Sequence, residues 1–300
     1  MIFKFYFYAS LFLLLFIIYF DILHIRTITY RNIQFHLYQL SIIDIDSFVL
    51  NPSNNDLYNL LNLKVELPNF NNLNIIPNKL FQTYNNKDKI PNYIFNNIKL
   101  YASNYEYTLF NDYDAIQFLN KYFDNRIIKC FNSMSKGAHK ADLLRYCYLY
   151  IYGGIYLDIK ILLIQPLENI FKINNIFYTC ISYDDYTIHN AILASPPRNK
   201  LFLYLIWYII NVPLLYIDKH YLIFCRNLYM QIQNDLITKS NKLMSGLNIG
   251  KSQNYYLFQE KVKNKLDSEC TKLDRYGICA SIYDHNNKIF IGRDPNFPWI

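Results

Sequence analysis

The segment Lys136–Leu167 constrains the fold of this chain more than any other part of the sequence. It reads KGAHKADLLRYCYLYIYGGIYLDIKILLIQPL and holds three of the seven glycines of the 300-residue chain, two of them side by side at Gly153 and Gly154. Apolar residues at helical spacing over Ala138–Tyr152 predict a helix that the glycine pair ends. The apolar run Ile155–Leu163 then predicts a buried strand. A helix followed directly by a buried strand is typical of an α/β domain.

Ionisable residues stand in this segment where an apolar core is expected. Asp142 and Arg145 are three residues apart, so they share one face of the predicted helix. In a continuous strand, Tyr156, Asp158 and Lys160 would also share one face. Burying a carboxylate and an ammonium costs free energy unless they pair with each other or bind something. The pattern allows two interpretations, a salt bridge at the strand end or a ligand site.

The flanking sequence extends the alternation of strands and helices. Strands are predicted at Ile76–Tyr84, Tyr105–Phe110, Tyr178–Tyr183 and from Ile289, and helices at Asn54–Leu63, Asn92–Ser103, Asp112–Phe123 and Leu201–Ile210. The last of these helices is strongly apolar but has only ten residues, which is too short to cross a bilayer and favours a buried core helix. Strands alternating with helices predict an α/β fold with a mainly parallel sheet.

Composition excludes several classes of protein. Hydrophobic residues make up 52% of the chain and charged residues 18%, which argues against a disordered protein. The net charge of +7 and the pI near 8.9 favour phosphate-bearing ligands or anionic membranes. The sequence has no arginine-rich run, so it does not favour nucleic acid as a partner. The six cysteines form no zinc-type spacing, and Cys270 and Cys279 are candidates for a disulfide in an oxidising compartment.

The amino terminus predicts a membrane anchor. From Phe5 to Phe20 the only polar groups are Ser10 and the tyrosine hydroxyls, and a run of this length is at the short end of what spans a bilayer. A cleaved signal peptide is the alternative, but no small-residue cleavage site follows the run. We therefore expect an uncleaved transmembrane signal anchor over residues 1–23, a stem with short helices over 24–75 and a catalytic domain over 76–300.

The central segment resembles the glycosyltransferases whose sugar-binding region contains a DXD motif, the group that includes initiating α-1,6-mannosyltransferases and capsular polysaccharide transferases. The matching residues are Ala141-Asp142-Leu143-Leu144-Arg145-Tyr146, Tyr152-Gly153-Gly154-Ile155-Tyr156-Leu157-Asp158-Ile159-Lys160 and Pro166-Leu167, with Ile76-Pro77-Asn78-Lys79 and Gln82-Thr83 upstream. The resemblance covers roughly residues 76–200. It implies a GT-A type fold, an α/β/α sandwich that binds a nucleotide at the carboxyl ends of its strands.

The resemblance also implies roles for individual residues. Gln82 and Thr83 would contact the nucleotide of a nucleotide diphosphate sugar, and Asp142 and Arg145 would bind the donor sugar. Asp158 would bind ribose, sugar or metal, as a catalytic residue with Asp142 and Arg145. The further nucleotide-sugar contacts implied are Gly153 and Gly154, which would let the backbone turn closely under the site, and Lys160 and Asn190. Lys140 is either a phosphate contact or a solvated lysine.

One departure from the family pattern concerns the metal. Lys160 stands where the second acidic residue of the DXD motif would help to hold Mn²⁺ or Mg²⁺. Three interpretations remain open at this point. Lys160 itself supplies the positive charge, another group completes the metal site with Asp158, or the protein binds without catalysis. The candidates for the missing metal ligand are Asp184, Asp185, Asp294 and His285.

The sequence therefore predicts a hexosyltransferase that uses a UDP- or GDP-sugar donor and a glycan, lipid or protein acceptor, with retention implied by the resemblance. The predicted anchor places the catalytic domain on the luminal or extracytoplasmic side of a membrane. The alternative is a catalytically inactive, membrane-tethered protein that binds a sugar nucleotide or a glycan.

Overall fold

The computed structural model describes residues 52–62, 64–238, 242–263, 279–285, 287–294 and 296–297. The predicted anchor over residues 1–23 and most of the predicted stem lie outside these residues. Within them, no helix combines the length and the apolar character needed to cross a bilayer.

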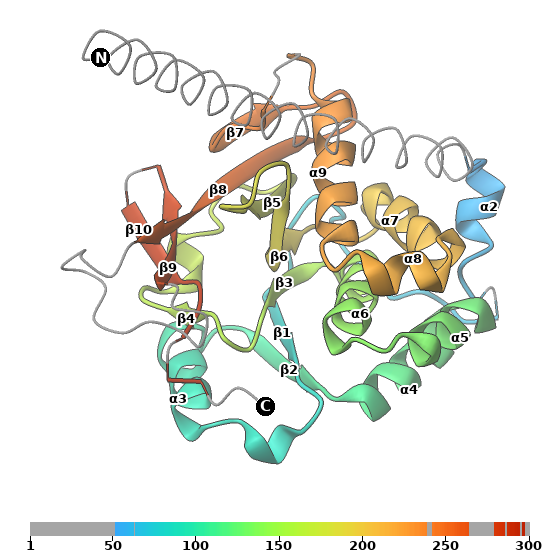
Figure 1. Ribbon diagram of the computed structural model, residues 1–300, viewed down its shortest axis with the longest axis horizontal. Helices are drawn as coiled ribbons and strands as arrows, with labels where there is room; N and C mark the ends of the chain where they lie inside the picture. The colour runs from blue at the N-terminus through green and yellow to red at the C-terminus, as the bar shows by residue number, and fades with distance from the viewer. Residues whose placement is uncertain are drawn as a thin grey trace, which may run out of the picture. The chain divides into compact units, whose positions relative to one another are not determined.

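The described strands form one curled, mixed sheet (Figure 1). Their order is β2-β1-β3-β6-β5-β8-β9-β10-β4, and β7 pairs with β8. The strands are β1 (Lys79–Thr83), β2 (Glu106–Phe110), β3 (Gly154–Leu157), β4 (Leu162–Leu163), β5 (Ile176–Ile181), β6 (Ile188–Ser195), β7 (Gly246–Ile249), β8 (Asn254–Lys263), β9 (Cys279–Asp284) and β10 (Asn287–Ile291). Because β4 directly follows β3 in the chain yet pairs with β10 at the other end of the order, the sheet curls back on itself.

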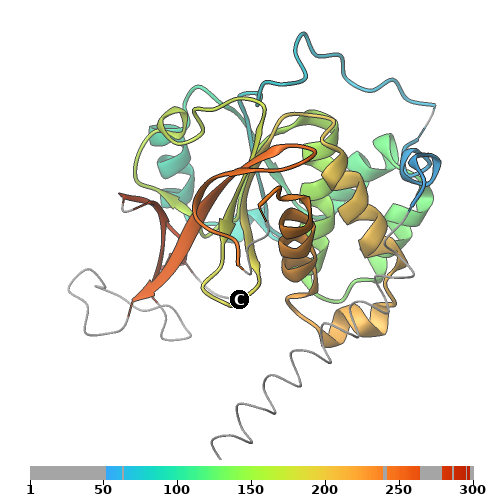
Figure 2. The ribbon, with the colours of Figure 1, turned by 90° about the horizontal axis from the view of Figure 1, so that it is seen from above.

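Helices cover both faces of this sheet, with α3 on one side and the longer helices on the other (Figure 2). The described helices are α2 (Asn54–Tyr58), α3 (Asn92–Tyr101), α4 (Asp112–Tyr122), α5 (Asn125–Ser133), α6 (Gly137–Tyr152), α7 (Lys200–Asn211), α8 (Leu214–Lys219) and α9 (Ile223–Asp235), with 3-10 turns at Lys87–Lys89 and Leu167–Asn169. Helix α6 packs on α7 and on strands β3 and β6. The described part of the chain is therefore a mixed α/β fold with helices on both faces of its sheet.

Alternation along the central strands divides the core between the two layers. Leu80 of β1 and Ile155 of β3 pack with Ile98 of α3 in one fully apolar cluster. Phe81 points to the opposite face, where its ring lies 4.0 Å from that of Tyr148 on α6. Each of these side chains is at least nine-tenths buried, and full burial of one large apolar side chain contributes about 1.5–3 kcal/mol.

Helix α6 is buried on nearly all sides because it lies between the sheet and α7. It ends at Gly153, which has φ +64° and ψ −157°, a conformation that is essentially restricted to glycine. A Cβ on Gly153 would lie 2.6 Å from the Pro197 nitrogen, and one on Gly154 would lie 2.6 Å from the Lys79 carbonyl oxygen. The two glycines thus allow α6 to turn directly into β3 against neighbouring backbone.

Several predicted elements are confirmed, and two expectations are wrong. The buried helix at Leu201–Ile210 is α7, and the helix and strand around the glycine pair are α6 and β3. The strand predicted over Ile155–Leu163 instead ends at Leu157, because a turn closed by a bond from the Ile161 N–H to the Asp158 carbonyl (2.9 Å) interrupts it. The sheet is also not mainly parallel.

The mixed character of the sheet has a topological reason. Among the described strands only the β1–β2, β1–β3 and β5–β8 pairings are parallel. Strand β6 returns from β5 by a short connection and inserts between β3 and β5, so it runs antiparallel to both. The remaining strands extend the sheet by antiparallel pairing.

Residues 52–62 pack on the helical layer rather than standing apart as a stem. The Asn62 N–H donates to the Tyr122 carbonyl (2.9 Å), and the Asp124 N–H donates to the Leu60 carbonyl (2.9 Å). Leu57 and Leu60 are fully buried. The helix predicted over Asn54–Leu63 begins as expected, with Ser53 and Asp56 forming a capping box, and ends early at Tyr58.

Candidate functional site

The candidate site lies where β1, β2 and β3 end. These strands are parallel and adjacent, so the residues that follow them gather at one edge of the sheet. Thr83 is the last residue of β1, Asn111 follows β2 and Asp158 follows β3. Helix α6 begins beside this edge and contributes Lys140, Asp142 and Arg145.

Arg145 is the centre of a buried charge cluster. Its side chain is only 4% exposed, and its guanidinium carbon lies 4.2 Å from the centre of the Tyr156 ring. One terminal nitrogen lies 3.5 Å from Asp142 Oδ1, and the other lies 3.3 Å from Asp158 Oδ1. Nε donates to the Ala141 carbonyl (3.0 Å), and Nη1 donates to the carbonyl of Asn190. Arg145 therefore contacts both carboxylates, and its bond to the Asn190 carbonyl links α6 to β6.

The two carboxylates of this cluster differ in how readily they ionise. Burial raises the pKa of Asp142 above 3.8 despite the neighbouring Arg145, since the group is almost completely enclosed. Burial also opposes ionisation of Asp158, but Arg145 and a hydrogen bond from Tyr156 outweigh it, and the pKa of Asp158 is lowered. Asp158 therefore stays ionised to lower pH than Asp142. The side chain of Asp158 is also 39% exposed.

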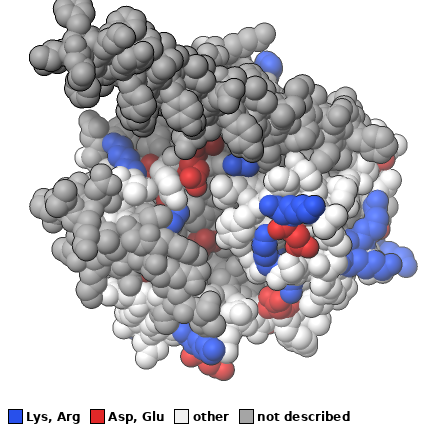
Figure 3. Space-filling model, in the orientation of Figure 1, with Lys and Arg blue, Asp and Glu red and all other residues white. Residues whose placement is uncertain are grey.

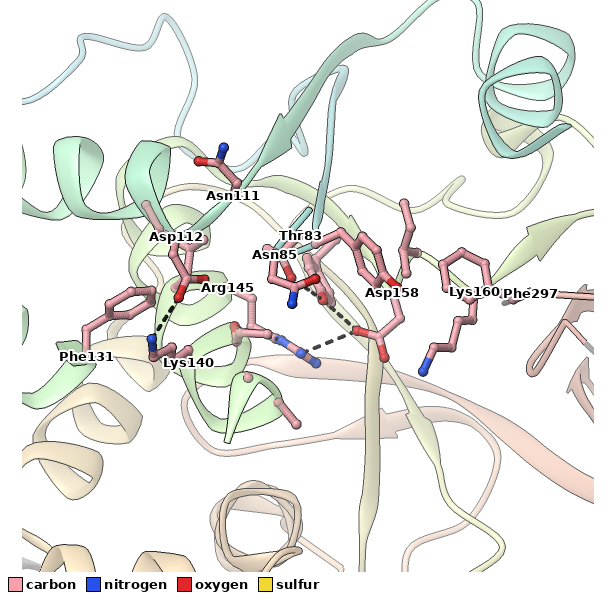
Figure 4. A pocket seen from close by; sticks show the side chains of 18 of the residues that line it. Thr83, Asn85, Asn111, Asp112, Phe131, Lys140, Arg145, Asp158, Lys160 and Phe297 are labelled. Atoms are coloured by element: carbon pink, nitrogen blue, oxygen red, sulfur yellow. Dashed lines mark hydrogen bonds and ion pairs between the residues drawn. The ribbon is translucent and has the colours of Figure 1, made fainter. Parts of the chain in front are cut away.

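Asp158 presents one of its oxygens to the pockets. The Tyr156 hydroxyl donates to Oδ1 at 2.5 Å, the same oxygen that faces Arg145. Within the described part of the chain, no side chain bonds to Oδ2. In Figure 4 the carboxylate lies between Arg145 and Lys160. Such an oxygen can accept a hydrogen bond from a sugar or ribose hydroxyl.

Two pockets meet at this cluster. One has a volume of about 350 Å³ and extends from the ends of β1 and β2 past Lys140 to Tyr156 and Phe297 (Figure 4). The other has a volume of about 530 Å³ and lies towards the β5–β6 loop and α9. Both are lined by Arg145, Asp158 and Lys160, together with Ala138 and Tyr221. We call them the strand-end pocket and the helix-side pocket.

The surface around the site carries both signs of charge. Figure 3 shows lysine, arginine and acidic side chains close together on this face rather than one field of a single sign. Lys140 is an example, since its Nζ lies 2.7 Å from Asp112 Oδ2 at the rim of the strand-end pocket. The net charge of +7 is therefore not concentrated in one basic patch on this face.

The turn after β3 brings Lys160 to both pockets. Because β3 ends at Leu157, the residues Asp158 and Lys160 belong to a turn and not to one face of a strand. The Asp294 N–H donates to the Lys160 carbonyl (3.1 Å), which fixes the turn to the carboxyl-terminal segment. The ammonium of Lys160 lies 5.9 Å from the Phe297 ring centre, and its charge helps to lower the pKa of Asp158.

The groups around Asp158 do not fit a divalent cation of the Mn²⁺ or Mg²⁺ type. Such ions take oxygen ligands, commonly one or two protein carboxylates together with substrate phosphates and waters, and a neighbouring ammonium repels them. Asp158 Oδ1 already accepts from Tyr156, and the neighbouring motif position holds an ammonium. Among the described residues, no three His, Cys, Asp or Glu side chains are close enough together to hold a metal ion.

The predicted metal partners are also placed elsewhere or already bonded. Asp185 is 74% exposed and pairs with Lys242 at 2.8 Å. Asp294 is completely buried, and its carboxylate accepts from the Tyr93 hydroxyl and from the Asn296 N–H (2.9 Å). His285 is exposed beside Tyr256 and lines neither pocket. Asp184 lines the helix-side pocket, and burial near Glu260 raises its pKa.

Other predicted site residues have structural roles. Gln82 is completely buried, donates to the Asp158 carbonyl (3.2 Å) and accepts from the Tyr107 hydroxyl (2.9 Å), so it supports Asp158 from behind. Gly153 and Gly154 lie at the opposite end of β3 from Asp158. The close contacts of this pair are with Pro197 and Lys79, and neither glycine lines the two pockets.

Thr83 and Asn190 do lie at the pockets. Thr83 lines the strand-end pocket, with its hydroxyl 3.4 Å from that of Tyr156. Asn190 lines the helix-side pocket, and its Nδ2 donates to Asp142 Oδ1 (2.9 Å) and to the Tyr146 hydroxyl (2.8 Å). Asn190 Oδ1 is buried without a hydrogen-bond partner among the described residues.

The sequence did not predict a role for two residues beside these pockets, Tyr156 and Glu260. Tyr156 bonds Asp158 and stacks on Arg145, yet in a chain with 30 tyrosines its position in the motif was the only available signal. Glu260 of β8 is completely buried and accepts from the Ser182 hydroxyl (2.9 Å), 3.4 Å from His189 Nδ1. It is 78 residues from Ser182 in sequence, so local spacing could not reveal it.

Comparison with known proteins agrees with this geometry. Residues 88–177 match the family described as "Glycosyltransferase sugar-binding region containing DXD motif". Over these residues the chain is similar to the sugar-binding region of glycosyltransferases. This region includes α6, the glycine pair, β3, Asp158 and Lys160, and it supplies most of the charge cluster.

A curated relative supports the same assignment over a shorter stretch. The chain is 35% identical over 71 residues to the "Initiation-specific alpha-1,6-mannosyltransferase" of Saccharomyces cerevisiae. The match covers 23% of this chain and 15% of the yeast protein. No solved structure gives a significant match. The similarity to glycosyltransferases thus rests on sequence over this part of the chain, and the fold around it is compatible with a glycosyltransferase.

Proposed function

We propose that this protein transfers a hexose from a nucleotide diphosphate sugar to a hydroxyl of a glycan, lipid or protein acceptor. The observation that carries the proposal is the position of Asp158. It lies within the glycosyltransferase sugar-binding region, at the end of β3, and in the wall shared by two pockets. A transferase needs such a junction, because donor and acceptor must meet at one carbon atom.

The donor fits the strand-end pocket in this proposal. Thr83, Asn85 and Asn111 offer hydrogen-bonding side chains to a nucleoside, and Asp158 Oδ2 accepts from a sugar or ribose hydroxyl. The acceptor enters through the helix-side pocket, which has polar groups from Asp184 and His189. The sugar then lies between the pockets, beside Asp158 and Lys160.

The reaction breaks the bond between the anomeric carbon and the diphosphate oxygen. The electron pair of that bond leaves with the nucleoside diphosphate, and the acceptor oxygen bonds to the anomeric carbon. The acceptor proton passes to the leaving diphosphate or to water. The chain contributes positioning and electrostatic stabilisation, with Asp158 near the positive charge that develops on the sugar. We extend the proposal to retention of configuration, as the family resemblance implies.

The location of the protein is part of this proposal. The apolar run at the amino terminus supports a single membrane anchor, with the catalytic domain on the luminal or extracytoplasmic side. Cys279 is disulfide-bonded, which is consistent with an oxidising compartment, and its predicted partner Cys270 lies outside the described residues.

A donor screen tests the proposed function. The full chain in detergent is incubated with UDP- and GDP-sugars, and nucleoside diphosphate release is measured with acceptor saccharides present. Release with one donor is expected, together with a loss of about 10²–10³-fold in Asp158→Asn, which keeps the shape of the side chain and removes its charge. The control Asp185→Asn removes an exposed carboxylate and should retain full release. Equal rates in Asp158→Asn and the unaltered chain would contradict the assignment.

Lys160 supports a second candidate, a membrane-tethered protein that binds a sugar nucleotide or a glycan without transferring the sugar. The lysine replaces an acid that the motif uses for its metal. Donor binding seen by calorimetry, with no release from any donor and acceptor pair, would favour this candidate.

A further inference from the structure

The inference concerns how the site balances the charge of a diphosphate, and it rests on the proposed function. A nucleoside diphosphate carries several negative charges, and its departure requires positive charge nearby. Asp158 is the single carboxylate that the motif keeps, and the Lys160 ammonium in the same turn disfavours a divalent cation beside it. A site that binds a diphosphate without such an ion must supply the positive charge from its own side chains.

Lys160 is placed to supply that charge. It lines both pockets, so it lies at the junction where the diphosphate would separate from the sugar. The turn after β3 and the bond from the Asp294 N–H to its carbonyl hold its backbone in a defined position. Its ammonium faces the ring of Phe297 and acts electrostatically on Asp158.

The other cations of the cluster are less suited to this task. Arg145 is almost completely buried and is already shared between Asp142, Asp158 and two carbonyl groups. Its positive charge is therefore already balanced by carboxylates and carbonyl groups of the protein. Lys140 pairs with Asp112 at the rim of the strand-end pocket, away from the junction.

We propose that the Lys160 ammonium binds the diphosphate of the donor in place of a divalent cation, so that nucleotide binding at this site is independent of metal. The motif position that usually supplies a metal ligand here supplies the positive charge itself. Returning an acid to this position should therefore recreate a need for the metal, because Asp158 and the new carboxylate would then form a pair that attracts a cation.

Calorimetric titration of UDP and GDP into the full chain in detergent tests this, once with a chelator and once with added Mn²⁺. The unaltered chain should bind one nucleotide with the same affinity in both buffers. Lys160→Gln should bind about 10–100-fold more weakly in both, since it loses a charged hydrogen bond to phosphate. Lys160→Asp should show little binding with chelator and regain it with Mn²⁺.

Two controls keep the comparison interpretable. Lys99→Gln removes an exposed lysine of α3 that lines neither pocket and should bind like the unaltered chain. Circular dichroism and thermal unfolding establish that each variant is folded, and Lys160→Arg, which keeps the charge, should retain most of the affinity.

The outcomes separate this inference from the proposed function. Nucleotide binding by the unaltered chain that drops tenfold or more in chelator would overturn the role of Lys160 and leave the transferase proposal intact. Full affinity in Lys160→Gln would do the same. Failure of the folded, unaltered chain to bind either nucleotide in both buffers would overturn the inference together with the proposed function.

Discussion

The two ends of strand β3 carry one continuous motif but perform different tasks. At the amino end, Gly153 and Gly154 have positive φ angles and touch the backbone of neighbouring segments. At the carboxyl end, Asp158 and Lys160 leave the strand and line two pockets. The first end is shaped by steric fit and the second by charge. Substitutions at the glycine end should therefore act through steric strain, and those at the charged end through unpaired charge that depends on pH.

The largest effect is expected for Arg145→Met, at the charged end. Removing the buried guanidinium leaves Asp142 and Asp158 near each other without their cation, which costs about 3–5 kcal/mol. The loss should be greatest above the raised pKa of Asp142 and should lessen as the pH falls through it, because protonation removes the buried charge. Thermal unfolding across pH measures this, and a loss independent of pH would contradict it.

Gly153→Ala should destabilise the fold by about 2–3 kcal/mol while the folded protein keeps its nucleotide affinity. The new Cβ meets the Pro197 nitrogen at 2.6 Å, in a backbone conformation that other residues rarely adopt. Gly137→Ala is the matched control, since its Cβ has nothing within 4 Å and the helix gains propensity. Denaturant unfolding compares the two. Equal stability of both variants would remove the steric role assigned to the glycine pair.

Gln82→Met tests the support behind Asp158 and should cost about 1–3 kcal/mol. It leaves the Asp158 carbonyl and the Tyr107 hydroxyl without their buried partner. Adding Tyr107→Phe removes the orphaned hydroxyl and should recover part of the loss, which a double-mutant cycle measures. Additive losses in the double variant would contradict the arrangement.

The smallest effect is expected for Tyr156→Phe, which keeps the ring under Arg145 and removes the hydroxyl bonded to Asp158. That bond lowers the pKa of Asp158, so its loss should raise the pKa and move the acid limb of the pH–rate profile to higher pH. The rate at neutral pH should fall about tenfold. The stability that ionised Asp158 contributes is present above 3.8 and is lost as the pH falls through its lowered pKa. In the variant this contribution should be smaller, and its loss should be complete at a higher pH. An unchanged acid limb would show that Asp158 does not control it.

The local elements of this domain could be predicted from sequence because their signals are local. Helix α6 has apolar residues at helical spacing and a glycine pair at its end, and α7 is a short apolar run before a proline. The family resemblance gave Thr83 and Asp158 roles in one site, and the structure places both where adjacent parallel strands end. The end of β3 was not predicted, because Ile159 and Ile161 continue the apolar pattern through the turn.

The sequence by itself determined the helix, glycine pair and strand of the motif, the closeness of Asp142 to Arg145, and the family to which this region is similar. Only the tertiary structure decided how these charges are paired and which side chains line the pockets. It placed Arg145 between two carboxylates, turned Gln82 behind Asp158 and moved Asp185 to the surface. The reason is physical. Helical spacing is set over a few residues, whereas burial and charge pairing depend on strands and helices that meet from distant parts of the chain.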